Sequence, residues 1–310
     1  MYEGIQSALS PQGPHAAVIA EISWVLIAGA TLIFGVVIAI AAYAIFARRE
    51  RAMRLREAPL IVGGGIVFPV VVLSALLIYT VVRAGSLEPA AGETPIRIEV
   101  TGEQWWWRVR YLDERGQLDF ETANEIHIPA GRAVEITLKS ADVIHSFWVP
   151  ALAGKLDMIP GRTNRLRIRA DRTGEYRGQC AEYCGGPHAF MAFFVVAETP
   201  ERHAEWAANE RAAAAPRSDH ALRGEKLFVS HCAACHTIRG TQAQGVRGPD
   251  LTHVGSRLTI AAGLLPNNAG TLAGWIASSQ HLKPGNLMPS FQQFKGEELR
   301  VLAGYLESLQ

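Results

Sequence analysis

The sequence predicts a membrane-anchored, multi-domain protein with a hairpin of two membrane-spanning helices, an antiparallel β-sandwich and a small helical domain. Three observations carry this prediction. Two long apolar runs lie near the N-terminus, a series of short strand-like patterns follows them, and helical periodicity returns towards the C-terminus. The chain of 310 residues is long enough for two or three domains.

The first two elements are apolar runs long enough to cross a bilayer. The run over residues 16–47 contains one charged residue, Glu21, and the run over residues 59–82 contains none. Each exceeds the roughly 20 residues that a membrane-spanning helix needs. We therefore expect an N-terminal part over residues 1–92, with membrane helices at about 17–47 and 59–83.

The loop between the runs predicts their orientation. It reads RRERAMRLRE, with five arginines, and short arginine-rich loops stay on the cytoplasmic side. We expect a bacterial inner membrane with the N-terminus and everything after Arg83 on the outer, periplasmic side. The first run is longer than a signal-peptide core, so we expect it to be retained. A role of Glu57 or Glu21 in proton uptake stays open, and an interfacial or solvated role is favoured for both.

The exported part divides where the composition changes. Short β-rich runs, from IRIEV to FFVVAE, are separated by turns that contain glycine, proline or aspartate, which is typical of a sandwich or barrel. The composition then changes to mostly alanine and charged residues in the segment TPERHAEWAANERAAAAPR, which predicts a partly helical, solvated connector. The expected domains are residues 93–198 for the β domain, 199–217 for the linker and 218–310 for the helical domain.

The net charge of +1 gives no indication of a nucleic-acid partner, and no basic stretch is interleaved with aromatic residues. The informative polar residues are instead two clusters that hold all four cysteines. Because the outer side of the membrane is oxidising, cysteines there are either paired as disulfides or occupied by another group.

The first cluster is CAEYCGGPHAFM, in which Cys180, Cys184, His188 and Met191 follow C-x3-C-x3-H-x2-M between two strands. A disulfide would leave the histidine and methionine without a role, and a zinc site rarely uses a thioether. Soft thiolates, imidazole and a weak methionine ligand suit electron-transfer copper. Two thiolates suggest two bridged copper ions, which would need a second imidazole.

Two histidines compete for that position. His145 lies among apolar residues in DVIHSFWVP, whereas His127 lies in the alternating strand pattern EIHIP and has the alternative role of an exposed strand residue.

Four motifs together resemble subunit II of haem–copper cytochrome c oxidases. They are GEQWWW, DVIHSFWVP, LDMIPGR and CAEYCGGPHAFM, and the resemblance covers about residues 15–198. It implies a cupredoxin-like domain that holds a dinuclear CuA centre. The implied copper ligands are His145, Cys180, Cys184, His188, Met191 and the backbone carbonyl of Glu182.

The same resemblance implies roles for two further residues. The Glu182 carboxylate would reach a magnesium ion shared with subunit I, and Trp105, the first of three consecutive tryptophans, would take in electrons near the copper. Since a second redox centre is attached to this chain, the entry role of Trp105 stays open. One departure from the family is PLIVGGGIVFP, which has glycines and valines before Pro69 where members commonly carry a glutamate and a tryptophan.

The second cluster, CAACH, is the C-x-x-C-H signature of c-type haem attachment. Cys232 and Cys235 would form the thioether bonds to haem, and His236 would bind the iron from one side. The alternative is a redox-active cysteine pair of the thioredoxin kind. That fold would need a βαβ context, whereas this segment has a helical pattern.

The sixth iron ligand is expected to be Met288, the only methionine after the first cluster. A His/Met pair raises the reduction potential, which suits a late step of a respiratory chain. His253 and His281 are the alternatives. GPDL and the LMP context resemble class I cytochromes c over about residues 218–310, and this resemblance favours Met288. The expected packing positions are Gly224, Phe228 and the C-terminal helix near Tyr305.

The combined pattern predicts the electron-input subunit of a haem–copper oxidase. The apolar runs contain no histidine, so oxygen reduction must take place on another chain. The resemblance implies subunit II of a caa-type cytochrome c oxidase, coupled to proton translocation. Its expected partners are subunits I and III, membrane lipid and a donor such as a cytochrome c or quinol–cytochrome c reductase. The alternatives are the donor subunit of a CuA-containing nitric oxide reductase and a free membrane-anchored electron carrier.

Overall fold

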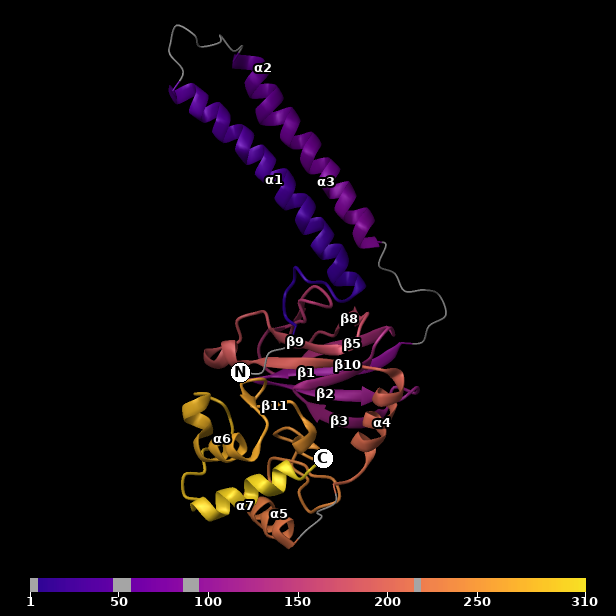
Figure 1. The fold of residues 1–310 in the computed structure, drawn as a ribbon, viewed down its shortest axis with the longest axis vertical. Helices are drawn as coiled ribbons and strands as arrows, with labels where there is room; N and C mark the ends of the chain where they lie inside the picture. The colour runs from indigo at the N-terminus through magenta and orange to yellow at the C-terminus, as the bar shows by residue number, and fades with distance from the viewer. Residues whose placement is uncertain (1–4, 47–56, 86–94, 215–218) are drawn as a thin grey trace. The chain divides into compact units, whose positions relative to one another are not determined.

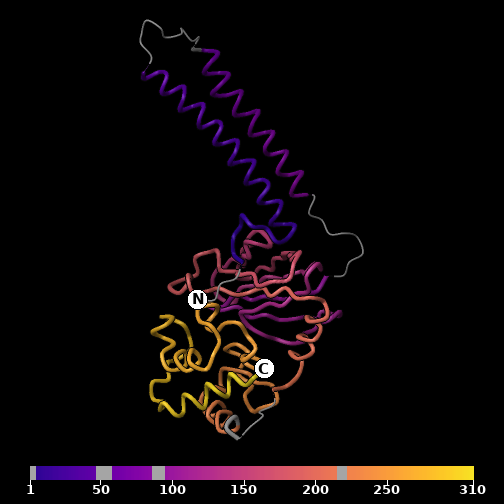
Figure 2. The backbone as a smooth tube through the Cα atoms, in the orientation of Figure 1, coloured from indigo at the N-terminus to yellow at the C-terminus, as the bar shows by residue number. Residues whose placement is uncertain are grey.

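The backbone of this computed structural model divides into two compact units, residues 17–91 and residues 1–16 together with 92–310. Figure 1 shows the helices and strands of both, and Figure 2 traces the same chain as a tube. The structure describes the residues in four ranges: 5–46, 57–85, 95–214 and 219–310.

The first unit is a helical hairpin, as the two apolar runs predict. Helix α1 (Pro14–Phe46) forms one arm. The other arm joins α2 (Glu57–Val62), the π-helical turn η1 (Gly63–Val67) and α3 (Phe68–Gly85). Both arms are long and apolar enough to cross a membrane, and no residue in the most apolar window of either is buried within the chain. Their exposed apolar surface is what lipid and other membrane helices would cover.

Polar side chains join the two arms of the hairpin. The Arg83 guanidinium forms an ion pair with the Glu21 carboxylate, and the Tyr79 hydroxyl donates to the same carboxylate over 2.8 Å. These contacts give Glu21 a role between helices. The arginine-rich loop lies outside the described residues, as does the side chain of Glu57, so the orientation of the hairpin and the role of Glu57 stay predictions.

The exported part begins with a sandwich of two five-stranded sheets, ordered β3-β2-β1-β5-β8 and β4-β10-β9-β6-β7. Most neighbouring strands are antiparallel, but β1 pairs with β5 and β4 with β10 in parallel. The sheets are therefore mixed, where the sequence predicts an antiparallel sandwich. The strands are β1 (Ile96–Glu103), β2 (Trp106–Leu112), β3 (Leu118–Ala123), β4 (Glu125–Pro129), β5 (Val134–Ser140), β6 (His145–Trp148), β7 (Leu156–Met158), β8 (Asn164–Ile168), β9 (Gly174–Cys180) and β10 (Ala192–Glu198).

Apolar and polar side chains alternate along the strands, and the apolar ones form the core between the two sheets. Ile98 and Val100 of β1 are fully buried, as are Phe147 and Phe193 from the other sheet. The Trp107 ring meets Phe147 edge-on, with ring centroids 6.0 Å apart. Such aromatic contacts add to the free energy gained by burying the rings, about 0.5–1.5 kcal/mol per pair.

The connector forms helix α4 (Pro200–Arg211), which begins where Thr199 caps it by accepting the Arg202 N–H. The described part of the connector is helical and mostly exposed, as predicted, but one face of the helix docks on the sandwich. Trp206 stacks on the His127 ring with centroids 4.1 Å apart, and Arg211 pairs with Asp119 of β3 over 2.7 Å. An amphipathic aromatic side chain in a chain of alanine and charge is enough to dock the helix on the sandwich.

The C-terminal domain is mostly helical, as predicted. Phe228 and Tyr305 are buried with ring centroids 6.2 Å apart. A Cβ added at Gly224 would lie 2.3 Å from the Tyr305 Cβ, so glycine allows α5 and α7 to cross closely. The three residues therefore pack as expected. The elements are α5 (Asp219–His231), η3 (Val254–Ser256), β11 (Thr259–Ile260), β12 (Leu265–Pro266), α6 (Ala269–Leu282) and α7 (Gly296–Glu307).

Candidate functional site

The six atoms expected to bind copper lie together at one end of the sandwich. The two thiol sulfurs are 3.7 Å apart, and Cys180 Sγ lies 3.2 Å from the Glu182 carbonyl oxygen. Soft sulfur and nitrogen atoms at such mutual distances fit a shared copper centre. The remaining distances are 3.9 Å from Cys180 Sγ to His145 Nδ1, 3.5 Å from Cys184 Sγ to His188 Nδ1 and 3.8 Å from Cys184 Sγ to Met191 Sδ.

Strand pairing explains why distant residues meet there. Cys180 ends β9 and lies opposite Phe147 of β6, which brings the start of β6 and its His145 to the same sheet edge. The Cys180 N–H donates to the Met191 carbonyl over 2.9 Å, so the ligand loop closes on itself. A Cβ added at Gly102 would lie 2.8 Å from the His145 ring, so this glycine makes room for the imidazole.

Hydrogen bonds among the candidate ligands set the electrostatics of the site. The hydrogen bond between the two sulfurs lowers the pKa of the Cys180 thiol and raises the pKa of the Cys184 thiol, so the pair favours a single thiolate at Cys180. His145 Nε2 lies 2.7 Å from the Asp142 carboxylate, which leaves Nδ1 facing the sulfurs. Such a carboxylate fixes the tautomer and orientation of a metal-binding histidine. Sequence reasoning missed Asp142, although an acid three residues before a candidate ligand is a readable signal.

His127, the competitor for the second imidazole, is remote from this chemistry. Its ring nitrogens lie 2.9 Å from Glu125 and 3.1 Å from Glu198, and the ring is covered by Trp206. His127 is buried, so its reading as an exposed strand residue is wrong. Only His145 of the two histidines lies beside the cysteines.

Glu182 offers its backbone to the sulfur cluster and its side chain to solvent. Its carboxylate is 3.8 Å from the Lys155 ammonium. Among the described residues, one group of three side chains lies within metal-binding distance, namely His145, Cys180 and Cys184. The side chains of this chain alone therefore give no support to the expected magnesium ion.

The three tryptophans have different surroundings. Trp107 is buried in the core, whereas Trp105 and Trp106 are partly exposed. The Trp105 indole N–H donates to the Cys184 carbonyl over 2.9 Å, and the Gln104 amide donates to the same oxygen over 2.8 Å. Trp105 therefore touches the backbone of a candidate copper ligand.

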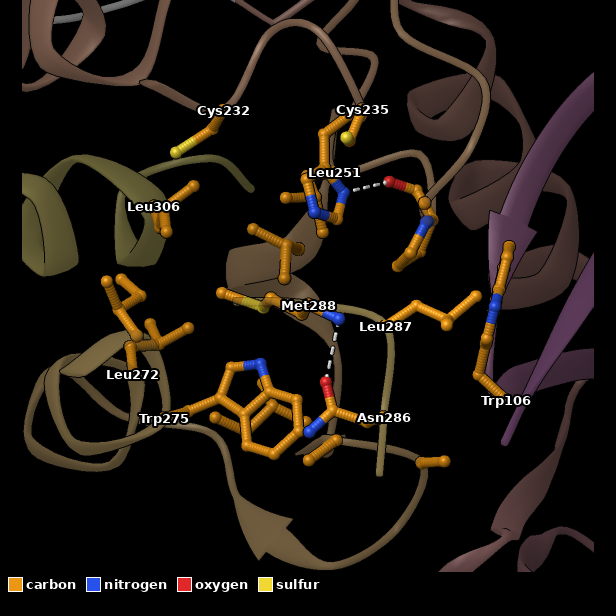
Figure 3. A pocket seen from close by; sticks show the side chains of 18 of the residues that line it. Trp106, Cys232, Cys235, Leu251, Leu272, Trp275, Asn286, Leu287, Met288 and Leu306 are labelled. Atoms are coloured by element: carbon orange, nitrogen blue, oxygen red, sulfur yellow. Dashed lines mark hydrogen bonds between the residues drawn. The ribbon is translucent and has the colours of Figure 1, made fainter. Parts of the chain in front are cut away.

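A cavity of about 610 Å³ opens in the helical domain, a size typical of cofactor sites (Figure 3). The two cysteines of CAACH and the expected iron ligands all line it. Trp105 and Trp106 complete one wall from the sandwich, and Figure 3 shows Leu287 reaching from the Met288 segment towards Trp106. The residues on the wall that are expected to attach the haem are Cys232, Cys235, His236 and Met288.

The two expected iron ligands are held by neighbouring polar groups. His236 Nδ1 lies 2.8 Å from the Pro249 carbonyl, which leaves Nε2 as the nitrogen available to a metal. Burial lowers the pKa of His236, which favours the neutral imidazole that binds iron. The Met288 N–H donates to the Asn286 side chain over 2.8 Å. A Cβ added at Gly248 would lie 2.6 Å from the His236 ring.

The alternative sixth ligands do not line the cavity. His253 Nε2 lies 3.0 Å from the Ala212 carbonyl, and His281 is exposed. The cavity wall instead contains a buried guanidinium, Arg257, whose Nη2 donates to Thr122 and to the Asp250 carbonyl, while its Nε has no hydrogen-bond partner among the described residues. A buried cationic side chain with one donor still unsatisfied suits a ligand that carries carboxylates, as haem does. The residues present therefore fit a haem.

Comparison with known proteins agrees with this geometry. The family model for the periplasmic domain of cytochrome c oxidase subunit II matches residues 113–198, and the cytochrome c model matches residues 221–310. Cytochrome c oxidase subunit 2 of Alkalihalophilus pseudofirmus is 35% identical over 98% of this chain and 90% of its own length. The chain belongs to the cytochrome c oxidase subunit II family. It carries a copper-binding cupredoxin-like domain and a haem-binding cytochrome c domain.

Other members of the subunit II family align with parts of the chain. The Bacillus subtilis protein is 30% identical over 70% of this chain and 63% of its own length. The crystal structure of the periplasmic domain of subunit II of cytochrome oxidase (CoxB) of Bradyrhizobium japonicum is 31% identical and covers 39% of this chain and 97% of that one, with a TM-score of 0.36. Together with the two apolar helices, the family places this chain among membrane-anchored proteins with periplasmic domains.

Proposed function

We propose that this chain is the electron-input subunit of a caa-type haem–copper oxidase, anchored in a bacterial inner membrane. The observation that carries the proposal is that both domains contribute residues to the wall of the cavity. Trp105 borders the haem cavity and donates a hydrogen bond to the carbonyl of Cys184, a candidate copper ligand. One side chain thus connects the two redox sites.

The proposed copper ligands are the six groups of the sulfur cluster. His145, Cys180, Cys184, His188, Met191 and the Glu182 carbonyl would hold a dinuclear CuA centre, since two thiolates can bridge two copper ions. Asp142 would orient His145 in that centre.

The proposed haem is covalent, with Cys232 and Cys235 in thioether bonds and His236 and Met288 on the iron. When bound, haem c and the copper pair would each supply a one-electron carrier between the donor and subunit I. The chain supplies orientation through Asn286 and Pro249, and it supplies an aromatic contact through Trp105.

The proposed partners follow from the family. Subunit I would hold the oxygen-reducing site and couple it to proton translocation, and subunit III would complete the complex. A cytochrome c or quinol–cytochrome c reductase would reduce the haem. The exposed apolar surface of α1 and α3 would lie against subunit I and lipid.

Purification through a tag on this chain tests the proposal. A reduced-minus-oxidised spectrum with haem c and haem a bands, together with oxygen uptake, is the expected result. Haem c with b-type haem and nitric oxide turnover would identify a nitric oxide reductase instead. Haem c and copper with no accompanying chain would identify a free carrier.

A further inference from the structure

The cytochrome c domain makes a buried polar contact with the sandwich beside both redox sites. Lys283 follows α6 and is 3% exposed. Its Nζ donates to the carbonyl oxygens of Trp105 over 2.6 Å, Phe190 over 2.7 Å and Ala261 over 3.1 Å. Trp105 and Phe190 belong to the sandwich, and Ala261 belongs to the cytochrome domain. The three acceptors use all three donors of an ammonium group.

Burying this ammonium costs free energy. Burial lowers the pKa of Lys283 to about 7, since its three hydrogen-bond partners are neutral carbonyls and no carboxylate among the described residues forms an ion pair with it. A methionine of similar length would fill the same volume without that cost. The ammonium instead fixes a position, because its three acceptors determine where the end of α6 lies on the sandwich.

On the haem side, this contact continues into a short loop, residues 283–288, that Asn286 holds by hydrogen bonds. The Asn286 amide donates to the carbonyls of Lys283 over 2.7 Å and Ser279 over 2.9 Å, and its oxygen accepts the Met288 N–H over 2.8 Å (Figure 3). Because one side chain ties both ends of the loop, a displacement of Lys283 is passed to Met288, the proposed iron ligand.

On the copper side, Lys283 contacts residues that lie next to candidate copper ligands. The Trp105 carbonyl accepts a hydrogen bond from Lys283. The Trp105 indole N–H in turn donates to the carbonyl of Cys184 over 2.9 Å. Phe190, the second acceptor, precedes Met191 in the chain. Lys283 is therefore attached to the backbone beside two candidate copper ligands.

We propose that Lys283 is the positioning residue that holds the haem site in register with the copper site for electron transfer between them. The inference rests on the proposed function. Other hydrogen bonds cross the same interface, including Ala192 N–H to Ala262 over 3.0 Å and Leu258 N–H to Glu125 over 2.8 Å. The Ala192 contact also lies beside Met191, but neither of these bonds reaches the loop that carries Met288, whereas Lys283 contacts the ligand-bearing segments on both sides.

The test compares K283M with wild type in the intact complex purified from membranes. After rapid reduction of haem c, we expect electron transfer to copper to slow by about tenfold or more, because small displacements of reacting groups have large kinetic effects. Reduction of haem c by its donor and the amounts of bound haem and copper should not change. Loss of packing alone would change those quantities too.

Hydrogen exchange gives a readout that does not depend on electron transfer. In K283M, protection of the Ala192 and Leu258 amides should fall by about tenfold, because the interface opens more often. K226M removes an exposed lysine of the same domain and should match wild type in both measurements.

Wild-type transfer and wild-type protection in K283M would overturn the inference. If K283M fails to retain haem or copper, K283Q decides in the same way, since its amide keeps two of the three donors. If the wild-type complex itself transfers no electron from haem c to copper, the proposed function fails. The exchange measurement still tests the position of Lys283 in that case.

Discussion

The candidate copper ligands lie within a few ångströms of one another in the β-sandwich, whereas the haem-attachment residues line a cavity of about 610 Å³ in the helical domain. Three of the candidate copper ligands, Cys180, Cys184 and Met191, are themselves part of the buried core of the sandwich, so side chains fill that core. The haem cavity is lined by residues of the domain's own core, among them Phe228, Leu272 and Leu302. The sandwich can therefore fold before it binds metal, but the cytochrome domain needs its cofactor to complete its core.

The largest expected effect is that of removing haem attachment. In the double variant C232S/C235S, haem c absorbance should disappear, and the cytochrome domain should become sensitive to protease while the sandwich stays resistant. The unfilled cavity would cost an amount comparable to the whole stability of a domain, about 5–15 kcal/mol. Limited proteolysis of the purified complex makes the comparison. A protease-resistant cytochrome domain without haem would show that the cavity is not part of its core.

Removing a copper ligand should have a large but more local effect. C184S should lose the copper EPR signal, while haem c absorbance and the protease resistance of both domains remain. The reason is that side chains, the candidate ligands included, fill the core around Trp107, Phe147 and Phe193. Metal analysis and the haem spectrum of the same sample provide the check. Loss of the sandwich together with the copper would remove the difference between the two sites.

A smaller effect is expected at Asp142, which orients His145. D142N keeps the size of the side chain but weakens its hold on the imidazole. Copper affinity should fall by about 10- to 100-fold, as for other partners of metal ligands. Competition with a copper chelator measures it. D157N, at an exposed acid of the same domain, is the matched control, and equal affinities in the two variants would argue against the role of Asp142.

The smallest effect concerns the docking of α4 on the sandwich. Burial alone would lower the pKa of His127, but hydrogen bonds to Glu125 and Glu198 raise it to about 9. Since this pKa exceeds the value of about 6.5 in an unfolded chain, the stabilisation is complete below about pH 6.5. It is lost as the pH rises through about 9. Thermal unfolding at several pH values should show this decline in wild type and a flatter profile in H127Q; parallel profiles would contradict it.

Local spacing made much of the copper and haem sites predictable. The candidate ligands within CAEYCGGPHAFM and CAACH are so close in sequence that they lie near one another in any fold. Each apolar run likewise predicts a membrane helix without information from the rest of the chain. Strand β3 is harder to identify from the sequence, because Asp119 and Glu121 belong to residue types that are depleted in strands. Arg257 and Lys283 act through contacts that only the tertiary structure creates. The docking of α4 depends on one tryptophan whose partner, His127, lies far back in the chain.

The most direct test of the central claim, that electrons enter through haem c and pass to copper within this chain, is rapid mixing of the oxidised complex with a limiting amount of reduced donor. The account predicts that haem c is reduced first and copper second, and that copper reduction slows severely in C232S/C235S. Copper reduced as fast in the haem-free variant as in wild type would contradict it.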